Sequence, residues 1–291
     1  MNTLFIQTNY KQMLGAKLGK YSFEKEAGPD RNFETQIMVV EKLPEMRDFV
    51  GKTYLTTGKL LRTYTFDDLQ SFTLTRFKPP ELMGYDDSAI VVDPDIFALP
   101  KTNINELFDL DLGGNDLAAC KRENPDGGEG KWESSVMLLD CQKLKHWHLA
   151  SILKRLEEKS ASAADFKSIR NGEKVLKLPW TWNSMDKIND DSKLLHTTKR
   201  LTQPWKTGLQ IDFTPSPLPK IFGLIPREPI HKLLGKYPTH YLPHPDKKVV
   251  DFFFSLVKSA LKDGAISEQE IQDEINKKNV RPDIFEVLKN Y

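Results

Sequence analysis

Two carboxylates separated by a proline follow a short apolar run in "AIVVDPDIFALP", residues 89–100. Asp93 and Asp95 are two positions apart, and on an extended backbone side chains at that spacing point to the same side. Such a pair at a strand end can hold a hard divalent cation such as Mg²⁺ or Mn²⁺. Asp-Pro-Asp also suits a helix start, with Asp93 as the N-cap and Pro94 as the first helical residue. Because short motifs often match by chance, this motif alone leaves both interpretations open.

A second polar cluster follows an apolar run in "SKLLHTTKRLTQPWKTG", residues 192–208. His196 ends the run, and Lys199, Arg200 and Lys206 come after it. An imidazole can complete the ligand shell of Mn²⁺, and lysine or arginine can hold phosphate oxygens. The alternative is an ordinary hydrogen-bonded histidine beside a solvated basic loop. Together with the two aspartates, the cluster favours a site for a metal ion and a phosphate-bearing ligand.

The composition is that of a globular protein with a balanced charge. The chain has 291 residues, 39% of them hydrophobic, which is enough for one large or two modest domains. Lys and Arg total 42 against 41 Asp and Glu, so no basic excess supports a general nucleic-acid role. Cys120 and Cys141 are isolated and read as reduced core thiols. With no signal-peptide pattern and no apolar run near the roughly 20 residues that span a bilayer, we expect a cytoplasmic protein.

The elements that must position these side chains alternate between two kinds of pattern. Apolar runs predict strands at 3–9, 35–42, 88–93, 134–141, 174–179 and 193–196, and helical spacing predicts helices at 10–27 and 142–159. This alternation indicates an α/β domain with a mostly parallel sheet. Ligands of such sheets bind at the carboxyl ends of strands, which is where Asp93 and His196 lie.

The composition changes near residue 214. Eight of the 18 prolines lie between Pro215 and Pro245, so we expect an extended segment that wraps over the domain. Helical patterns return at 246–263, 267–278 and 281–290. A catalytic domain at 1–214 and a Pro-rich, helical extension at 215–291 are therefore predicted. The stripe Phe252–Phe254 is expected in the core, with peripheral membrane contact as the alternative.

Five segments, in order, resemble the family 8 glycosyltransferases and close relatives with the GT-A fold. They are "LFIQTN", "LTRFKPPELMGYDDSAIVVDPDIFAL", "WESSVMLLDCQKLKHW", "LKLPWTWNSMD" and "LLHTTKRLTQPW", which together extend from residue 3 to about residue 208. No single motif is decisive, but five in order at plausible spacings are specific. The resemblance implies a Rossmann-like mixed sheet flanked by helices.

The resemblance also implies roles for individual residues. Asp93, Asp95 and His196 match the metal ligands of the family, and Arg76 matches an arginine close to the donor. The loop that holds the base and ribose corresponds to Gln7, Thr8 and Asn9, and Arg76 and Asp93 belong to the donor-binding set, with Arg76 also a catalytic candidate. The phosphate-binding role could pass to Lys199, Arg200 or Lys206.

The chain departs from the family pattern at three places. Lys199 stands where the family has glycine, and Gln203 precedes Pro204 where the family has lysine. Residues 133–135 are Glu-Ser-Ser in place of Asn-Ala-Gly. The family's Asp-Gln-Asp is Ala-Ala-Asp at 163–165, so of its acids Asp165 alone remains. Asp165 is the candidate for orienting donor or acceptor hydroxyls, and its alternative is a surface acid at a helix start.

The function implied by the resemblance is hexosyl transfer. The donor would be a nucleotide-diphosphate sugar, with UDP-hexose favoured, and the acceptor a glycan, a lipid-linked glycan or a protein. The reaction would depend on Mn²⁺ or Mg²⁺ and retain the anomeric configuration. Three alternatives stay open: a sugar nucleotidyltransferase, an inactive nucleotide-sugar-binding protein and a purely structural protein.

Overall fold

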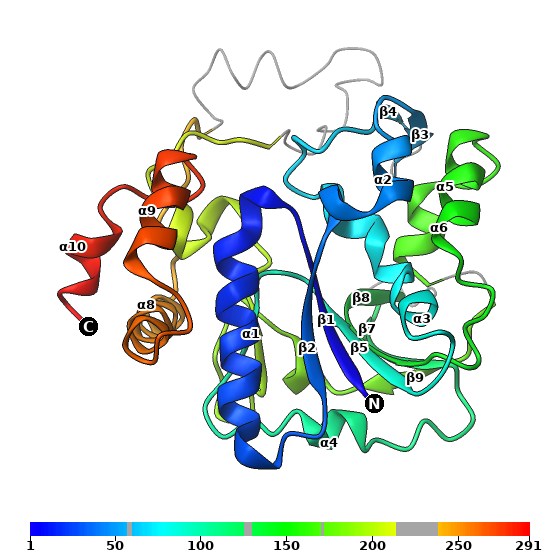
Figure 1. Ribbon diagram of the computed structural model, residues 1–291, viewed down its shortest axis with the longest axis horizontal. Coiled ribbons are helices and arrows are strands. Elements are labelled where there is room, and N and C mark those ends of the chain that lie inside the picture. Colours follow the sequence, from blue (N-terminus) through cyan, green and yellow to red (C-terminus); the bar gives the residue numbers. More distant parts are fainter. Residues whose placement is uncertain (57–59, 125–129, 170–171, 214–237) are drawn as a thin grey trace.

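The centre of the molecule is a mixed sheet (Figure 1). The computed structural model describes residues 1–56, 60–124, 130–169, 172–213 and 238–291. Within them the sheet has six strands in the order β2-β1-β5-β8-β7-β9. β8 runs antiparallel to both of its neighbours, whereas the other pairings are parallel. The strands are β1 (Thr3–Thr8), β2 (Glu34–Val39), β5 (Ser88–Val92), β7 (Leu117–Arg122), β8 (Lys131–Asp140) and β9 (Val175–Leu178).

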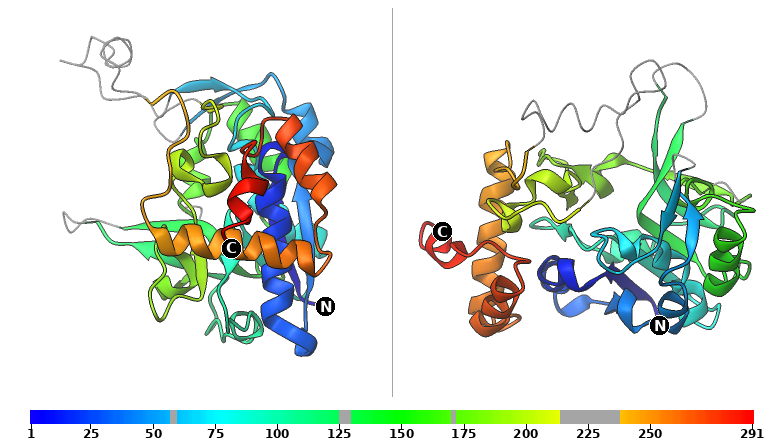
Figure 2. Two further views of the ribbon diagram at one scale, coloured as in Figure 1. Left: turned by 90° about the vertical axis from the view of Figure 1, so that its left-hand side faces the viewer. Right: turned by 90° about the horizontal axis from the view of Figure 1, so that it is seen from above.

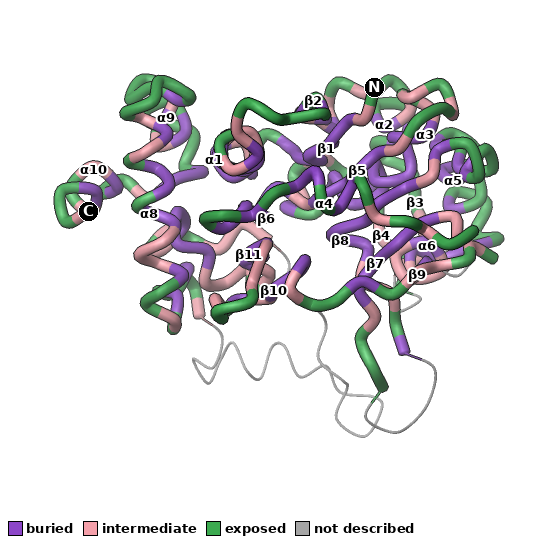
Figure 3. Tube along the Cα trace, turned by 90° about the horizontal axis from the view of Figure 1, so that it is seen from below, coloured by how far each residue is buried: buried purple, intermediate pink, exposed green. Residues whose placement is uncertain are grey.

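Helices cover both faces of this sheet, because alternate side chains of each strand point to opposite faces. Along β1, Leu4 and Ile6 pack on one side and Phe5 on the other. The first face is covered by α1 (Met13–Ala27) and α4 (Asn105–Phe108). The second is covered by α2 (Pro44–Asp48), the 3₁₀ helix η4 (Ser71–Phe77), α5 (Leu149–Glu157) and α6 (Ala163–Lys167). Figure 3 shows the buried residues following the strands.

A small second sheet joins two segments that are far apart in the sequence. β10 (Ser184–Met185), β11 (Leu194–His196) and β6 (Ile96–Ala98) pair in that order. β11 runs antiparallel to β6 with His196 opposite Ile96, and the Thr197 amide donates to the Asp95 carbonyl over 3.0 Å. Asp93 is followed by a turn and then by β6, so the helix-start interpretation of Asp-Pro-Asp is wrong. The apolar Ile96–Ala98 continues as a strand because β11 supplies its backbone partners.

The remaining helices and strands are short. They are η1 (Tyr10–Gln12), η2 (Gly28–Asp30), η3 (Val40–Lys42), β3 (Thr53–Leu55), β4 (Leu61–Thr63), α3 (Pro79–Leu82), η5 (Trp180–Asn183), η6 (Arg200–Thr202) and η7 (Pro204–Lys206).

One expected helix is shorter than predicted. The pattern at 142–159 suggested one helix, but residues 142–148 form turns and α5 begins at Leu149. These turns bury both Leu144 and Trp147 in the core beside the sheet.

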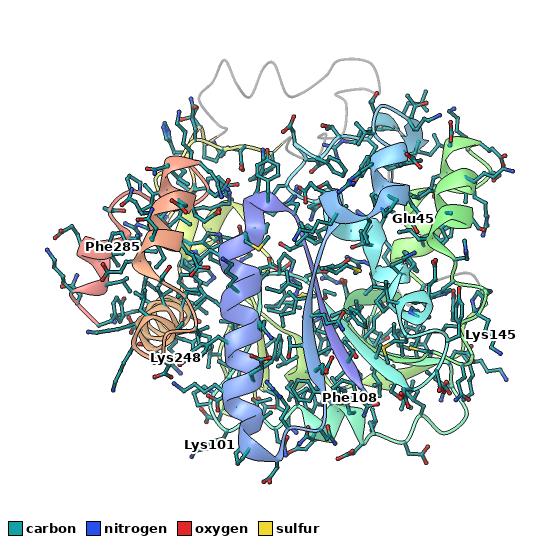
Figure 4. The ribbon with its side chains drawn as sticks, in the orientation of Figure 1. Glu45, Lys101, Phe108, Lys145, Lys248 and Phe285 are labelled. Carbon is teal, nitrogen blue, oxygen red and sulfur yellow. The ribbon has the colours of Figure 1, made fainter. Side chains whose placement is uncertain are left out.

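The C-terminal helices lie together beyond α1 (Figures 1 and 2). They are α8 (Lys247–Lys262), α9 (Glu268–Asn276) and α10 (Ile284–Leu288). Side chains fill the space between α1 and these helices, on which Lys248 and Phe285 are labelled (Figure 4). Phe253 is fully buried and stacks on Trp205 with ring centroids 5.0 Å apart, so the core placement of the Phe252–Phe254 stripe is confirmed.

Two further expectations concern this part of the chain. The capping box of α9 is present, since Ser267 and Glu270 exchange side-chain and backbone hydrogen bonds. The expected Pro-rich wrap lies largely in 214–237, and the expected domain boundary also lies there, outside the described residues. In the part of the chain that is described, no helix has the length and apolar character needed to cross a bilayer.

Candidate functional site

Three side chains predicted as metal ligands come together where β5 and β11 end. Asp93, Asp95 and His196 each offer one ligand atom, and these atoms lie within 4.8 Å of one another. Their side chains are 15%, 10% and 7% exposed. Two carboxylates and an imidazole are a donor set that suits Mn²⁺ and also accepts Mg²⁺. The residues present therefore fit the metal ion that the sequence predicts.

A hydrogen-bond chain from β8 orients His196. The Asn183 amide donates through Nδ2 to the Ser135 hydroxyl over 2.9 Å, so its oxygen faces the histidine. His196 Nδ1 lies 2.9 Å from that oxygen and therefore carries the donated proton. In the neutral ring this leaves the lone pair of Nε2 on the side of Asp95, whose Oδ1 is 3.5 Å away. Outer partners of this kind fix the tautomer of metal-binding histidines.

Neutral and charged donors hold the two carboxylates. Oδ1 of Asp93 accepts hydrogen bonds from Gln7 Nε2 at 2.5 Å and from Arg76 Nη2 at 3.1 Å. Oδ2 of Asp95 accepts one from Gln203 Nε2 at 3.1 Å. Among the described residues, no hydrogen bond reaches the second oxygen of Asp93, and none reaches Oδ1 of Asp95, which has His196 Nε2 3.5 Å away. Each aspartate therefore keeps an oxygen for a ligand.

Two glycines of α1 allow the helix to pack directly on the loop that carries the aspartates. A Cβ on Gly15 would lie 2.5 Å from the Pro94 carbonyl oxygen, and one on Gly19 would lie 2.9 Å from that of Ile96. Both distances are shorter than a real contact, and the atoms in the way are backbone atoms. The position of the metal-binding loop therefore depends on the absence of side chains at these positions.

We expect Gly15→Ala to weaken Mn²⁺ binding although it removes no ligand. The added methyl group must displace Pro94, and with it both aspartates, relative to His196. Displacing an outer support of a metal site costs about 10–100-fold in affinity, and overpacking costs about 1–3 kcal/mol of stability. Isothermal titration with Mn²⁺ measures the first and urea unfolding the second. An unchanged Mn²⁺ affinity would show that the loop position does not depend on this contact.

The ligands influence one another electrostatically. Burial raises the pKa of Asp93, and the positive charge of Arg76 opposes this shift. Burial lowers the pKa of His196, but the charge and hydrogen bond of Asp95, together with Asp93, outweigh it, so the net pKa is raised above 6.5. In the absence of a metal ion, the two carboxylates therefore favour the protonated form of the imidazole.

Mn²⁺ affinity should rise with pH because the metal competes with this proton. Binding needs neutral His196, so the dissociation constant is expected to fall as pH increases between about 6 and 8. The metal-free protein should show the opposite trend. A histidine whose pKa is raised by folding stabilises the folded state at low pH, and this stability is lost as pH rises through the folded pKa. Titration calorimetry and unfolding across this range test both trends, and a pH-independent affinity would contradict the assignment of His196.

A cavity of about 270 Å³ opens above the triad. Besides the three ligands its walls include Arg76 and Arg200, two of the predicted donor-binding residues. The remaining lining residues are Gln12, Leu69, Gln70, Phe72, Thr73, Lys131, Trp132, Glu133, Ser134, Ser135, Lys167, Ser168, Thr198 and Gln203. The mixture of cations, hydroxyls and aromatic rings suits a polar, anionic ligand that also offers flat surfaces.

Gln7, Thr8 and Asn9 lie behind the cavity wall. All three are fully buried and do not line the cavity. Gln7 binds Asp93, while Asn9 donates to the carbonyls of Asp68 and Leu69 and to the Ser71 hydroxyl. These contacts position the metal ligand and the segment in front of it. Their contact with a base and ribose stays a prediction.

The basic candidates after His196 lie in different places. Arg200 lines the cavity and packs on the Phe213 ring at 4.7 Å. Lys199 is exposed and faces a separate surface groove beside Asp186 and Lys247. Lys206 is fully buried and pairs with Asp212 at 3.2 Å. Of the three candidates for holding phosphate, Arg200 is the one that lines the cavity, and its phosphate contact stays a prediction.

Asp165 has the structural role that was its alternative interpretation. Its Oδ2 accepts hydrogen bonds of 2.8 Å from the amide and the hydroxyl of Ser162, which completes a capping box at the start of α6. It does not line the cavity. The helix that it caps instead presents Lys167 to the cavity.

Among the residues that were not identified from the sequence, three have defined contacts or positions in the site. They are Gln203, Asn183 and Lys167. The first two act by hydrogen-bonding to metal ligands, which spacing in the sequence does not reveal. Lys167 lies in the segment that resembles the family only through the acid at position 165. For Gln203 the sequence offered one indication of a role in the site, namely a polar residue between His196 and Trp205. Lys167, four residues after the lost Asp-Gln-Asp position begins, offered no pattern of its own.

Comparison with known proteins gives matches in structure but not in sequence. No protein-family model matches the chain, and no curated protein matches it. The galactosyltransferase LgtC, solved with donor and acceptor sugar analogues, has a TM-score of 0.50 at 16% identity, over 70% of this chain and 89% of that one. GlyE of Streptococcus pneumoniae TIGR4 has a TM-score of 0.46 at 17% identity, over 70% and 55% of the two chains. Mouse xyloside xylosyltransferase 1 has 0.44 at 17% identity, over 68% and 98%.

At these sequence identities a structural match shows the fold alone. The TM-scores of 0.46 and 0.44 are too low to establish even a common fold. The match with LgtC covers most of both chains, and the mixed sheet, its flanking helices and the site at its strand ends are as the sequence predicts. The chain therefore has the GT-A fold of glycosyltransferases.

Proposed function

We propose that this chain is a metal-dependent glycosyltransferase that transfers a hexose from a nucleotide-diphosphate sugar, with UDP-sugar favoured, to a glycan or glycoconjugate. The observation that carries the proposal is the cluster of Asp93, Asp95 and His196 at the base of a cavity in a GT-A fold. Five sequence segments in order, two of which contain these ligands, resemble family 8. Membership of that family is part of the proposal.

The proposed reaction needs charge stabilisation more than covalent chemistry. A metal ion held by the triad would neutralise the charge that grows on the diphosphate leaving group. Arg200 adds a positive charge from the cavity wall. Arg76 holds Asp93 in place through their ion pair. The acceptor hydroxyl attacks the anomeric carbon, the bond to the diphosphate oxygen breaks, and the hydroxyl proton passes to the departing phosphate. Retention of configuration is the expected outcome.

Thermal unfolding with UDP, GDP, CDP and ADP, each with and without Mn²⁺, tests this proposal first. A ligand that binds the folded state stabilises it by about 2.7 kcal/mol at a hundredfold excess over Kd. We expect one diphosphate to raise the unfolding temperature, and only when Mn²⁺ is present. If no nucleotide does so, the chain is not a nucleotide-sugar enzyme. Turnover of the matching sugar nucleotide then separates an active enzyme from an inactive binding protein, and release of pyrophosphate would identify a nucleotidyltransferase.

The two neighbours Lys199 and Arg200 provide a matched pair for testing the diphosphate position. Arg200→Met removes a cation from the cavity wall, so we expect at least a tenfold loss in nucleoside diphosphate affinity, as is typical for a charge-assisted hydrogen bond. Lys199→Met removes an exposed cation that faces another groove and should leave the affinity within about twofold. Equal effects of the two substitutions would show that only the overall charge matters.

A further inference from the structure

Most charged groups around the cavity have a partner. Arg76 pairs with Asp93 at 3.1 Å, and Glu133 pairs with Arg122 at 2.8 Å. Lys167 differs from them. Its ammonium group has no ion pair or hydrogen bond with any of the described residues, although its carbonyl accepts a hydrogen bond of 2.8 Å from the Ser134 hydroxyl.

The two acids whose charges act on Lys167 already form ion pairs with other cations. Asp68 and Asp93 both raise its pKa, but Asp68 is 2.8 Å from Arg62 and Asp93 is bound to Arg76. Burial, together with the positive charge of Arg76, lowers the pKa of Lys167 to about 8. A half-buried amine with two arginines nearby and no partner is unfavourable unless a ligand supplies a negative charge.

Lys167 is separated from the metal ligands by a defined chain of contacts. Asp93 binds Arg76, Arg76 donates to the Ser134 hydroxyl, and Ser134 donates to the backbone of Lys167. Together with a bound divalent ion, the triad, Arg76 and Arg200 leave two positive charges, which match the two negative charges of a diphosphate. The wall formed by Ser134 and the end of α6 is therefore left for the group that the diphosphate carries.

A second donor lies beside the lysine. Ser168 follows it in the chain and also lines the cavity, and its hydroxyl makes no hydrogen bond with the described residues. An ammonium group and a free hydroxyl on adjacent residues are suited to one carboxylate group. On the basis of the proposed function, we propose that Lys167 and Ser168 bind the carboxylate of the donor sugar, so that the preferred donor is a nucleotide-diphosphate uronic acid.

Binding of UDP, UDP-glucose and UDP-glucuronate in the presence of Mn²⁺ tests the inference by titration calorimetry. The natural protein should bind UDP-glucuronate at least tenfold more tightly than UDP-glucose, the gain expected from one charge-assisted hydrogen bond. Lys167→Met keeps the length of the side chain and should remove this preference while leaving the affinity for UDP unchanged. Lys167→Arg should retain most of it. Lys154→Met, on the exposed face of α5, is the control and should change nothing.

The other outcomes separate this inference from the function on which it rests. If the natural protein binds the two sugar nucleotides equally, the carboxylate site is wrong while the enzyme proposal stands. If Lys167→Met weakens UDP, UDP-glucose and UDP-glucuronate alike, the lysine holds the diphosphate and the uronic-acid assignment is wrong. If the natural protein binds none of the three, the proposed function with a UDP-sugar donor fails, and this inference fails with it.

Discussion

Asp95→Asn is expected to reduce Mn²⁺-dependent transfer by about a thousandfold, the loss seen when a main electrostatic contributor to a reaction is removed. The neutral amide is a poor ligand for a hard cation, and Asp95 offers one of three ligand atoms in the cluster. The fold should be preserved, because Gln203 can still hydrogen-bond to the new side chain. Binding of Mn²⁺, followed by electron paramagnetic resonance, should be lost together with turnover.

The stability of the metal-free variant makes this test more specific. Asp95 is one of the causes that raise the pKa of Asp93, which means that the two carboxylates repel each other. Removing Asp95 relieves this repulsion but also removes a partner of His196, so the decisive result is that stabilisation by Mn²⁺ disappears. Asp190→Asn, at an exposed loop position, is the matched control and should behave like the natural protein. Full Mn²⁺-dependent turnover in Asp95→Asn would exclude the triad as the catalytic metal site.

Those parts of the site that depend on strand ends could be predicted from the sequence. Asp93 follows an apolar run and His196 ends another, and ends of strands are where α/β folds bring polar residues together. The small sheet of β6 and β11 then aligns the two segments through backbone hydrogen bonds. Alternating apolar runs and helical spacing likewise predicted the α/β sheet, whereas its mixed character followed from the family resemblance and not from these patterns. Local sequence patterns were therefore sufficient to predict those site residues whose position is determined by the backbone of a strand.

Pairing between distant side chains could not be predicted in the same way. Lys206 and Arg200 look alike in the sequence, yet the first is bound to Asp212 in the interior and the second lines the cavity. Gln203 took a place beside Asp95 only because β6 and β11 are neighbours. Asp165 caps its own helix, which is the local alternative that its position at a helix start allowed. Which partner a charged side chain finds depends on tertiary contacts that spacing does not encode.

Arg76→Met is expected to destabilise the protein by about 3–5 kcal/mol, the usual cost of removing one partner from a buried ion pair. The guanidinium is 5% exposed and hydrogen-bonds to Asp93, to the Thr73 carbonyl at 2.7 Å and to Ser134. Without it Asp93 becomes a buried carboxylate whose main compensating charge is gone. Urea unfolding of the metal-free protein measures the loss.

A second substitution distinguishes the loss of charge from the loss of packing. In Arg76→Met combined with Asp93→Asn no unpaired carboxylate is left, so part of the lost stability should return. Arg31→Met is the control: its partner Glu24 is 2.9 Å away on the surface, and the expected cost is below about 1 kcal/mol. If the double variant is no more stable than Arg76→Met, the arginine supports the site through packing and its bonds to Thr73 and Ser134.

The pH dependence of Arg76→Met provides an independent measure of the same interaction. The positive charge of Arg76 is the main influence that lowers the pKa of Asp93 against the effect of burial, so its removal should raise that pKa further. A carboxyl group whose pKa is higher in the folded state stabilises that state at low pH, and the contribution is lost as pH rises through the folded value. The defect of Arg76→Met should therefore shrink on acidification. Added Mn²⁺ should also reduce it, because a cation bound to Asp93 replaces the missing charge, and a defect that is independent of both pH and Mn²⁺ would show that Arg76 does not act on this carboxylate.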